Sequence, residues 1–195
     1  MGASAVRLVI AEMAAGGGPT RVVEEVSRGV LLGRDTFSSG RIRTETAERT
    51  LAALEGFRRV MDRYGVQHVR AVATSAVREA RNSEIFLDRI RGRTGIGFDI
   101  INEAEESRLM YLAVRHALGR HPAFRGAWTL VAEVGGGSTS LTLLRRGQPN
   151  RSGVYALGAV RLRQVLDLAR HCHDLQVALL KRSIANVVDE IRLEI

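Results

Sequence analysis

The chain has 195 residues, of which 45% are hydrophobic and 26% are charged, a composition typical of a globular protein rather than a disordered or fibrous one. Its net charge of +8 comes almost wholly from arginine, since Lys181 is the only lysine. The single cysteine, Cys172, excludes an internal disulfide framework and favours a reducing compartment. No apolar run approaches the roughly 18 residues that would span a bilayer, and the first residues lack the pattern of a signal peptide, so we expect a cytoplasmic protein without a membrane partner.

The arginines point to an anionic ligand. A guanidinium group binds phosphate through a planar two-pronged fork, so a polyanion is an expected partner. The alternative is a general arginine bias in the composition, and for most individual arginines we favour that interpretation. Nucleic acid is disfavoured, because aromatic residues make up only 5% of the chain and are not interleaved with the basic ones.

Strand and helix patterns alternate through the first half of the chain. Strand patterns cover Ala5–Met13, Arg21–Leu32, Val69–Ala73 and Gly97–Ile101, and helix patterns cover Thr44–Tyr64, Val77–Ala80, Glu84–Arg93 and Glu103–Leu118. The first two strands are expected to form a hairpin around a turn at Gly16–Pro19. Asp35–Gly40 is expected to be a loop, and Asn82 or Ser83 can cap the helix that follows them.

The pattern restarts after a linker marked by Pro122 and Gly126. Strands are predicted at Ala127–Glu133, Thr139–Arg145 and Arg151–Leu157, and helices at Val160–His171 and Leu175–Leu193. Met1-Gly2-Ala3-Ser4 precedes a strand as Val134-Gly135-Gly136-Gly137-Ser138 does, which suggests two related lobes. We therefore predict a mixed α/β protein with a first lobe over residues 1–122 and the beginning of a second, truncated lobe over residues 123–195.

The run Gly135-Gly136-Gly137-Ser138-Thr139 is the clearest functional signal. It lies between two apolar strand patterns, and its glycines lack the Cβ atoms that would keep an anion away from the backbone N–H groups. Glu133, at the end of the incoming strand, is well placed to hold a metal ion beside that anion. The sequence thus predicts a phosphate-binding turn with a divalent-metal ligand next to it.

A second candidate anion site lies at a strand-to-helix junction. Thr74, Ser75 and Arg78 bring two hydroxyl groups, a helix N-terminus and a guanidinium group together. A capped helix with solvated arginines explains the same residues equally well.

The acidic first turn of the helix predicted at Glu103–Leu118 also has two interpretations. Acids in this position stabilise the helix dipole, which is the favoured explanation for any one of Glu103, Glu105 and Glu106. A carboxylate close to a phosphate site can instead orient or deprotonate a water molecule. The five histidines show no metal-ligand spacing, and we interpret His171-Cys172-His173 as a helix end rather than a zinc site.

Four segments together resemble one known family. ATSAVREARN, INEAEESRL, VGGGSTSLTLL and ALGAVRL occur in the order and at the spacings of the exopolyphosphatase and guanosine pentaphosphate phosphohydrolase family, over essentially the whole chain. The resemblance implies an RNase H-like fold of the actin, sugar kinase and heat-shock chaperone superfamily, with two lobes and a cleft between them. It implies hydrolysis of a terminal phosphoanhydride of polyphosphate or guanosine pentaphosphate with Mg²⁺ or another divalent cation, and it allows a homodimer.

The resemblance also implies roles for individual residues. Glu106 falls on the family's general base, and Glu133 falls on an acidic position that binds metal. The implied phosphate ligands are Arg78 with Thr74 and Ser75, the first-lobe loop residues Gly2 and Ser4, and the glycine turn with Gly135, Gly136, Gly137, Ser138 and Thr139.

The chain departs from the family pattern at five positions. In the first loop, the Asp would lie one position before Met1, and Ser4 and Ala5 stand where the family has an Asn and a second Ser. Glu133 is one methylene longer than the family Asp, and Ser140 stands where the family has a Glu. Loss of one preorganised catalytic group can cost about 10²–10³ in rate. A catalytically weakened module that still binds polyphosphate or a nucleotide is therefore the alternative to an active phosphohydrolase, and an incomplete fragment is a third reading.

Overall fold

The computed structural model describes residues 1–13 and 20–194, so the turn predicted at Gly16–Pro19 lies outside them. The chain folds into two compact units, Met1–Ile100 and Ile101–Ile195. These units are defined by contacts, whereas the predicted lobes are defined by repeated architecture, so the lobe boundary after residue 122 stays a prediction. No helix in the described ranges combines the length and the apolar character needed to cross a membrane.

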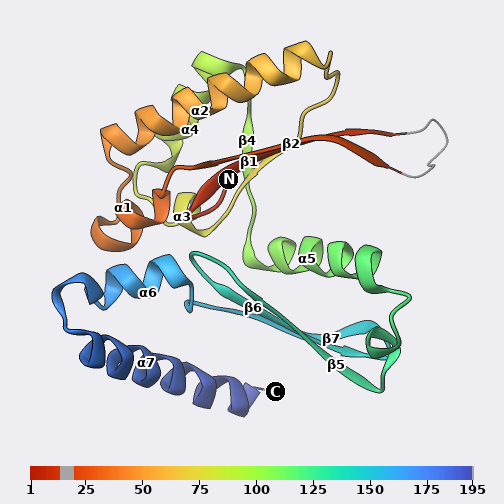
Figure 1. The fold of residues 1–195 in the computed structure, drawn as a ribbon, viewed down its shortest axis with the longest axis vertical. Coiled ribbons are helices and arrows are strands. Elements are labelled where there is room, and N and C mark those ends of the chain that lie inside the picture. Colours follow the sequence, from red (N-terminus) through yellow and green to blue (C-terminus); the bar gives the residue numbers. More distant parts are fainter. Residues whose placement is uncertain (14–19, 195) are drawn as a thin grey trace. The chain divides into compact units, whose positions relative to one another are not determined.

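The first unit combines two pairs of strands with several helices. Its elements are β1 (Ala5–Glu12), β2 (Arg21–Gly29), α1 (Leu32–Ser39), α2 (Thr44–Arg63), β3 (Ala71–Ala73), α3 (Ser75–Arg78), α4 (Ser83–Thr94) and β4 (Phe98–Ile100). β1 and β2 form the predicted antiparallel hairpin, and β3 pairs in parallel with β4. α2 and α4 pack against each other over one side of these strands (Figure 1).

The buried face of α2 carries much of the first unit's core. Leu51, Leu54, Phe57 and Met61 follow one another at helical spacing and are all buried, which confirms the helix predicted at Thr44–Tyr64. Burying such side chains stabilises the fold by about 1.5–3 kcal/mol each relative to leaving them exposed. The core therefore holds α2 firmly against the strands.

The loop predicted at Asp35–Gly40 is wrong, because Leu32–Ser39 forms helix α1. Its glycine and serine residues are poor helix formers, so local propensity hides the helix. Tertiary contacts stabilise it instead. Leu32 is fully buried, and the carboxylate of Asp35, a residue only 4% exposed, accepts a hydrogen bond from the backbone N–H of Arg43 at 3.0 Å.

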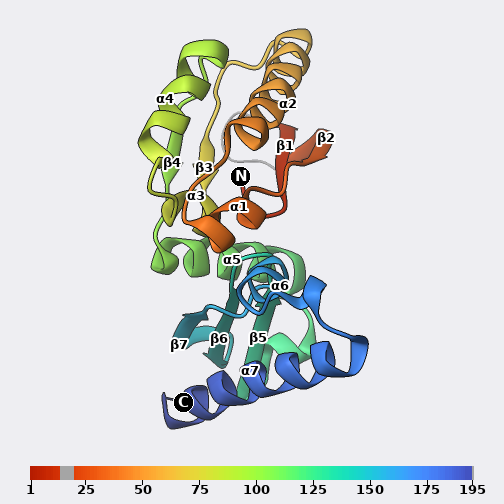
Figure 2. The ribbon, with the colours of Figure 1, turned by 90° about the vertical axis from the view of Figure 1, so that its left-hand side faces the viewer.

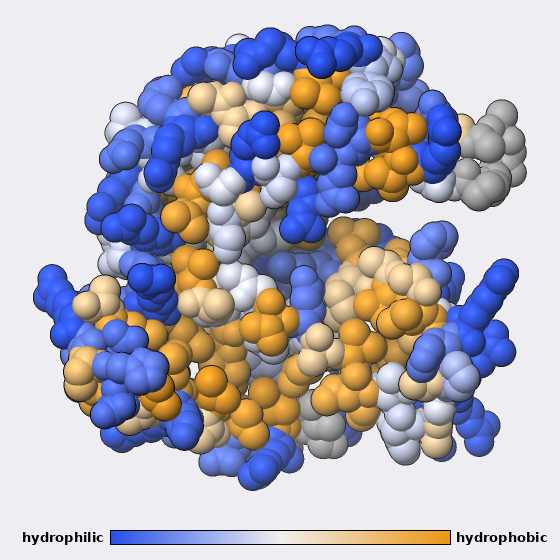
Figure 3. Space-filling model, in the orientation of Figure 1, coloured by the Kyte–Doolittle hydropathy of each residue, from blue (hydrophilic) through white to orange (hydrophobic). Residues whose placement is uncertain are grey.

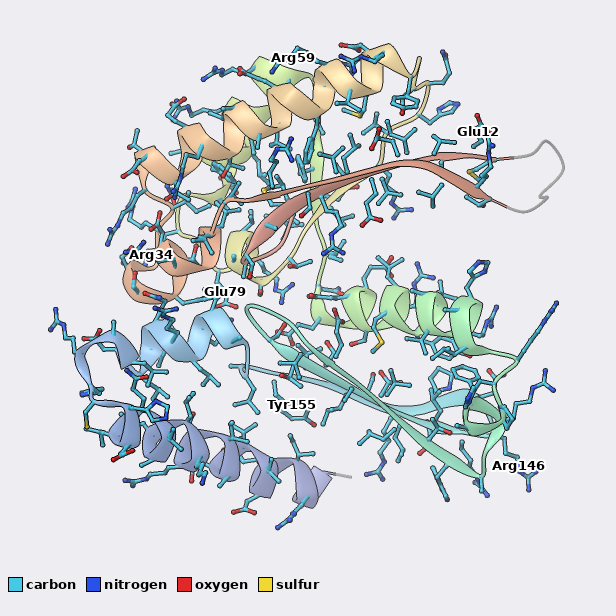
Figure 4. All side chains as sticks on the ribbon, in the orientation of Figure 1. Glu12, Arg34, Arg59, Glu79, Arg146 and Tyr155 are labelled. Atoms are coloured by element: carbon cyan, nitrogen blue, oxygen red, sulfur yellow. The ribbon has the colours of Figure 1, made fainter. Side chains whose placement is uncertain are left out.

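The second unit is built on a three-stranded antiparallel sheet with the order β5-β6-β7. Its elements are α5 (Glu103–Leu118), the short 3-10 helix η1 (Pro122–Arg125), β5 (Trp128–Val134), β6 (Thr139–Arg145), β7 (Gln148–Tyr155), α6 (Ala159–Val165), the 3-10 turn η2 (Leu168–Arg170) and α7 (His173–Glu194). α5 covers one face of the sheet, where Tyr111 packs against Leu144. The Tyr111 hydroxyl also donates a hydrogen bond to the Gly147 carbonyl oxygen at 3.0 Å. Figure 4 labels Arg146 in the tight turn next to this bond and Tyr155 at the end of β7.

The helix predicted at Val160–His171 is shorter than expected. α6 ends at Val165, and Asp167 adopts a left-handed conformation with φ of 46° before the turn η2. A non-glycine residue in this conformation interrupts the α-helix. The predicted helix at Glu103–Leu118 and the three predicted strands are confirmed, within a few residues at their ends.

Candidate phosphate-binding site

The glycine turn joins β5 to β6 in the second unit (Figure 1). A hydrogen bond from the Gly135 N–H to the Ser138 carbonyl oxygen at 2.8 Å closes it. The start of α6 lies against the turn. The N–H groups of Ala159 and Val160 donate to the carbonyl oxygens of Gly135 and Gly136 at 3.0 and 2.9 Å.

Arg161 extends this contact to the third glycine. Its backbone N–H donates to the Gly136 carbonyl oxygen at 3.0 Å, and its side-chain Nε donates to the Gly137 carbonyl oxygen at 2.5 Å. In a trans peptide the C=O and the following N–H point in opposite directions. Since the carbonyl groups point towards α6, the N–H groups of Gly136, Gly137 and Ser138 point away from it. Among the described residues, none of these three N–H groups donates to a backbone carbonyl, and such an array suits an anion.

Gly158 allows α6 to approach the turn this closely. It is the residue before α6, with φ of −91° and ψ of 145°, a conformation open to any residue. A Cβ atom here would overlap the Gly137 carbonyl carbon and the Gly136 carbonyl oxygen. No pattern in the sequence assigns Gly158 a role, although a glycine directly before the helix of the ALGAVRL segment is the available signal.

Glu133 and Ser140 lie directly opposite each other on β5 and β6. Side chains of such a cross-strand pair point to the same face of the sheet. Because side chains alternate along a strand, Leu144 shares this face with Ser140, and α5 packs there through Tyr111. Glu133 is exposed, whereas Ser140 is only 3% exposed. The Glu133 carboxylate therefore belongs to the face that α5 covers, directly before the glycine turn.

Glu106 lies in the first turn of α5. Figure 1 shows this end of α5 at the same end of the sheet as the glycine turn. The Asn102 side chain caps the helix by accepting a hydrogen bond from the Glu105 N–H at 2.9 Å. The hydrogen bond from Arg108 to the Glu105 carboxylate, together with the charge of that carboxylate, raises the pKa of Arg108 above its usual value. The second unit thus brings Glu106, Glu133 and the glycine turn to one end of its sheet.

The first unit gathers the other predicted residues at the end of β3. The Thr74 N–H donates to the Met1 carbonyl oxygen at 3.1 Å, and the Thr74 hydroxyl lies 3.9 Å from where a Cβ atom on Gly2 would stand. The Thr74 carbonyl oxygen accepts a hydrogen bond from the Arg78 N–H at 3.0 Å. The turn that opens the chain and the start of α3 are therefore neighbours, and they carry Gly2, Ser4, Thr74, Ser75 and Arg78.

Two further side chains fasten α3 and the segment that follows it to the chain around residues 36–42. The Thr36 hydroxyl donates to the Ala76 carbonyl oxygen at 2.8 Å. The Asn82 side chain accepts a hydrogen bond from the Ile42 N–H and donates one to the Ile42 carbonyl oxygen, at 3.0 and 2.9 Å. Asn82 stands directly before α4, as predicted, but its side chain makes no capping hydrogen bond.

The donor set of the second unit fits a divalent cation that binds together with phosphate. Mg²⁺ in proteins uses one or two carboxylates, and water and substrate phosphates complete its shell. Glu133 offers one exposed carboxylate beside the turn, and its cross-strand partner Ser140 offers a hydroxyl group. Within residues 1–13 and 20–194, no three His, Cys, Asp or Glu side chains gather as a metal site. The protein therefore offers a partial shell that phosphate oxygens would complete.

The second unit consists of a strand, a tight turn, two further strands and a helix whose first residues pack on the turn. This arrangement is that of the actin-like, RNase H-related class of proteins. The chain belongs to the Ppx/GppA phosphatase family, whose family model matches residues 9–195. This match confirms the resemblance on which the assignment of Glu106, Arg78 and the glycine turn rests.

Curated relatives carry the names of exopolyphosphatases. The chain is 32% identical over 162 residues to Exopolyphosphatase 1 of Mycobacterium tuberculosis (strain ATCC 25618 / H37Rv), a match that covers 83% of this chain and 46% of that protein. The chain spans about half the length of the curated relatives it matches.

Solved structures of the family share the fold. The crystal structure of the Aquifex aeolicus family member matches with a TM-score of 0.68 and 30% identity, over 84% of this chain and 51% of that one. An exopolyphosphatase-like protein matches with a TM-score of 0.82 and 28% identity, over 97% of this chain and 58% of that one. These likenesses confirm the predicted actin-related α/β fold.

Proposed function

We propose that the protein is a phosphohydrolase that releases the terminal phosphate of inorganic polyphosphate or guanosine pentaphosphate. The observation that carries the proposal is the glycine turn, whose three N–H groups point away from α6 beside the acidic residues Glu133 and Glu106. The family and the names of its exopolyphosphatase members support the same reaction class.

The residues of the second unit surround the phosphoryl group that is transferred. The N–H groups of Gly136, Gly137 and Ser138 bind its oxygens and stabilise the charge that develops there in the transition state. Glu106 orients the attacking water and accepts its proton. Thr139 keeps the turn attached to the chain that leads into α6, since its hydroxyl donates to the Leu157 carbonyl oxygen at 2.6 Å.

The first unit carries a second set of groups that can bind phosphate oxygens. Arg78 supplies a planar fork for two oxygens, and Thr74, Ser75, Gly2 and Ser4 supply hydroxyl and backbone donors. The net charge of +8 attracts a polyanion from a distance and makes its binding sensitive to salt.

Glu133 is the residue that would hold the divalent cation. When bound, such a cation neutralises phosphate charge and so lowers the cost of attack by water. Glu133 reaches one methylene further than Asp, so it keeps the charge while placing its oxygens farther from β5. A cytoplasmic location is part of the proposal, because the lone Cys172 suits a reducing compartment.

Ser140 favours a second candidate function, that of a catalytically weakened module that binds polyphosphate or a nucleotide. It is buried opposite Glu133, where a second carboxylate would add to the cation shell. The binding groups of the turn do not depend on this residue. Binding would therefore survive a loss of catalysis.

Phosphate release distinguishes the two candidates. Long-chain polyphosphate and guanosine pentaphosphate are incubated separately with the protein, with Mg²⁺ and with a chelator, and free phosphate is measured. We expect release that requires Mg²⁺ from at least one of the two substrates. No release from either substrate, together with salt-sensitive polyphosphate binding, would contradict the phosphohydrolase and leave the binding module.

A matched pair of variants at Ser140 sharpens this test. If the missing carboxylate limits catalysis, Ser140→Glu should raise Mg²⁺-dependent phosphate release by about tenfold or more. Ser140→Gln introduces a side chain of the same shape as Glu but without its charge, and it should not raise release. Equal release from both variants and the parent chain would show that this position does not limit the reaction.

A further inference from the structure

The three peptide groups of the glycine turn are held in two different ways. Backbone N–H groups at the start of α6 hold the carbonyl oxygens of Gly135 and Gly136. The Gly137 carbonyl oxygen accepts its hydrogen bond from the Nε atom of the Arg161 side chain, at 2.5 Å. In the described part of the chain, no backbone N–H donates to this third oxygen. Figure 2 shows α6 at the end of the sheet where β5 turns into β6.

The turn of the first unit holds the corresponding peptide group with backbone atoms. Its closing bond runs from the Gly2 N–H to the Ala5 carbonyl oxygen at 3.0 Å, from the first residue of the turn to the fourth, as in the glycine turn. The third residue is Ser4, whose carbonyl oxygen accepts from the N–H groups of Val30 and Leu31, both at 3.0 Å. In the glycine turn, one arginine side chain therefore replaces two backbone donors.

The peptide group that Arg161 holds carries the third N–H of the anion-binding array. The Gly137 C=O and the Ser138 N–H belong to the same planar group, so the direction of one fixes the direction of the other. Glycine adopts a wider range of backbone dihedral angles than other residues, so Gly137 itself constrains this plane little. Rotation of the plane would point a carbonyl oxygen, instead of an N–H, at the anion. The bond from Arg161 therefore determines where the Ser138 N–H points.

Arg161 also brings a positive charge to this bond. The residue is half-buried, its neighbours Val160 and Leu162 are apolar, and Figure 3 shows apolar residues, in orange, over much of the second unit. A hydrogen bond from a charged donor is roughly twice as strong as one between neutral groups. Hydrogen bonds that share a peptide group polarise one another, so the bond from Arg161 makes the Ser138 N–H a stronger donor.

We propose that Arg161 is a positioning residue, which orients and polarises the peptide group between Gly137 and Ser138 so that the Ser138 N–H binds the transferred phosphoryl group. The identity of this anion rests on the proposed function, whereas the orientation of the peptide group is testable without any anion. The charge on the phosphoryl oxygens is redistributed in the transition state, where an oriented donor contributes most. Loss of Arg161 is therefore expected to lower kcat more than it raises KM.

Three variants of Arg161 separate its donor from its charge. Arg161→Met keeps an unbranched stem without a donor, Arg161→Lys restores a charged donor, and Arg161→Gln restores a neutral one. We expect Arg161→Met to lower kcat for phosphate release by about 10–100-fold, Arg161→Lys to recover most of this loss and Arg161→Gln to recover part of it. Arg163→Met is the matched control, because Arg163 lies on the same helix and is exposed.

Amide resonances of the same variants test the orientation itself. In the absence of phosphate, the Ser138 amide resonance should move in Arg161→Met and return towards its parent position in Arg161→Lys. When tripolyphosphate and Mg²⁺ are added, the Gly136 amide should still shift in Arg161→Met, since backbone groups of α6 hold the peptide group on its C-terminal side, whereas the shift of the Ser138 amide should be lost.

The outcomes distinguish positioning from a structural role. An unchanged Ser138 resonance in Arg161→Met, or an equal loss of release in Arg163→Met, would overturn the proposal. So would a loss in Arg161→Lys as large as that in Arg161→Met, accompanied by an equally lowered midpoint of thermal unfolding. If the parent chain releases no phosphate, the proposed function fails, while the Ser138 resonance in the absence of phosphate still decides whether Arg161 orients the peptide group.

Discussion

The turn of the first unit and the glycine turn of the second share a backbone scaffold but differ in their surroundings. The first has Ala3 and Ser4 at its tip, with hydroxyl groups and Arg78 beside it, and the second has two glycines, with Glu133 on the strand that leads into it. Glycines allow close approach to the backbone, and carboxylates can bind a cation and orient water. Under the proposed function, the contrast favours the second unit for the chemistry and the first for charge-based binding of phosphate.

The largest expected effect is the loss of the proposed base. Glu106→Gln keeps the shape of the side chain but removes its ability to accept a proton, so phosphate release should fall by about 10²–10³ while polyphosphate affinity is retained. Glu103→Gln, in the same helical turn, is the matched control and should retain activity. Unchanged release by Glu106→Gln would place the base elsewhere and break the assignment of chemistry to the second unit.

The contact between α6 and the glycine turn should be the most sensitive structural feature of the second unit. A Cβ at position 158 meets backbone atoms that cannot move independently, so Gly158→Ala should lower the free energy of unfolding by about 3 kcal/mol. At Gly33 of α1, which packs on the turn of the first unit, a Cβ meets the Phe37 ring at 2.7 Å and the Ala3 Cβ at 2.8 Å.

Side chains can adjust more readily than backbone, so Gly33→Ala should destabilise less than Gly158→Ala. Gly29→Ala is the control, because nothing lies within 4 Å of a Cβ there. Denaturant unfolding measures all three variants, and equal losses at positions 33 and 158 would contradict the structural difference between the two turns.

The proposed anion site at the start of α3 is expected to depend on Asn82. Asn82→Ala removes both hydrogen bonds to Ile42 and should lower stability by about 2 kcal/mol, while weakening polyphosphate binding through α3. Asn82→Asp keeps the acceptor but not the donor and should recover part of the loss. An unchanged unfolding midpoint for Asn82→Ala would show that α3 is held by other contacts.

The smallest expected effect concerns the sheet of the second unit. The Thr142 hydroxyl is buried and has no hydrogen-bond partner among the described residues. Thr142→Val replaces it with a methyl group of similar size, so stability should stay the same or rise by about 1 kcal/mol. A clear loss of stability, measured by thermal unfolding, would indicate that the hydroxyl binds water or a ligand in solution.

Much of the fold follows from periodicity in the sequence. The apolar face of α2 and the strand pattern of Thr139–Arg145 are strong and local, so both elements are predicted nearly to the residue. α1 escapes prediction because its stability comes from the burial of Leu32 and Asp35, which depends on distant parts of the chain. The end of α6 depends on the left-handed backbone conformation of Asp167, which no side-chain pattern in the sequence predicts.

Part of the candidate site can also be predicted from the sequence. Glycines, acids and hydroxyls in sequence identify the two turns, because their chemistry is local. The support of the turns is not local: Gly158 packs against residues more than twenty positions earlier, and Asn82 bonds to Ile42 across 40 positions. Such contacts exist only in the folded chain, so a single sequence does not reveal them.

The most direct test of the account is whether the glycine turn binds phosphate through its backbone. Amide resonances of the chain are followed by NMR while tripolyphosphate and Mg²⁺ are added, with sodium sulfate at equal ionic strength as the control. The account predicts saturable shifts of the Gly136, Gly137 and Ser138 amides that sulfate does not reproduce. Unchanged resonances at these three residues, with shifts confined to arginine-rich surfaces, would contradict it.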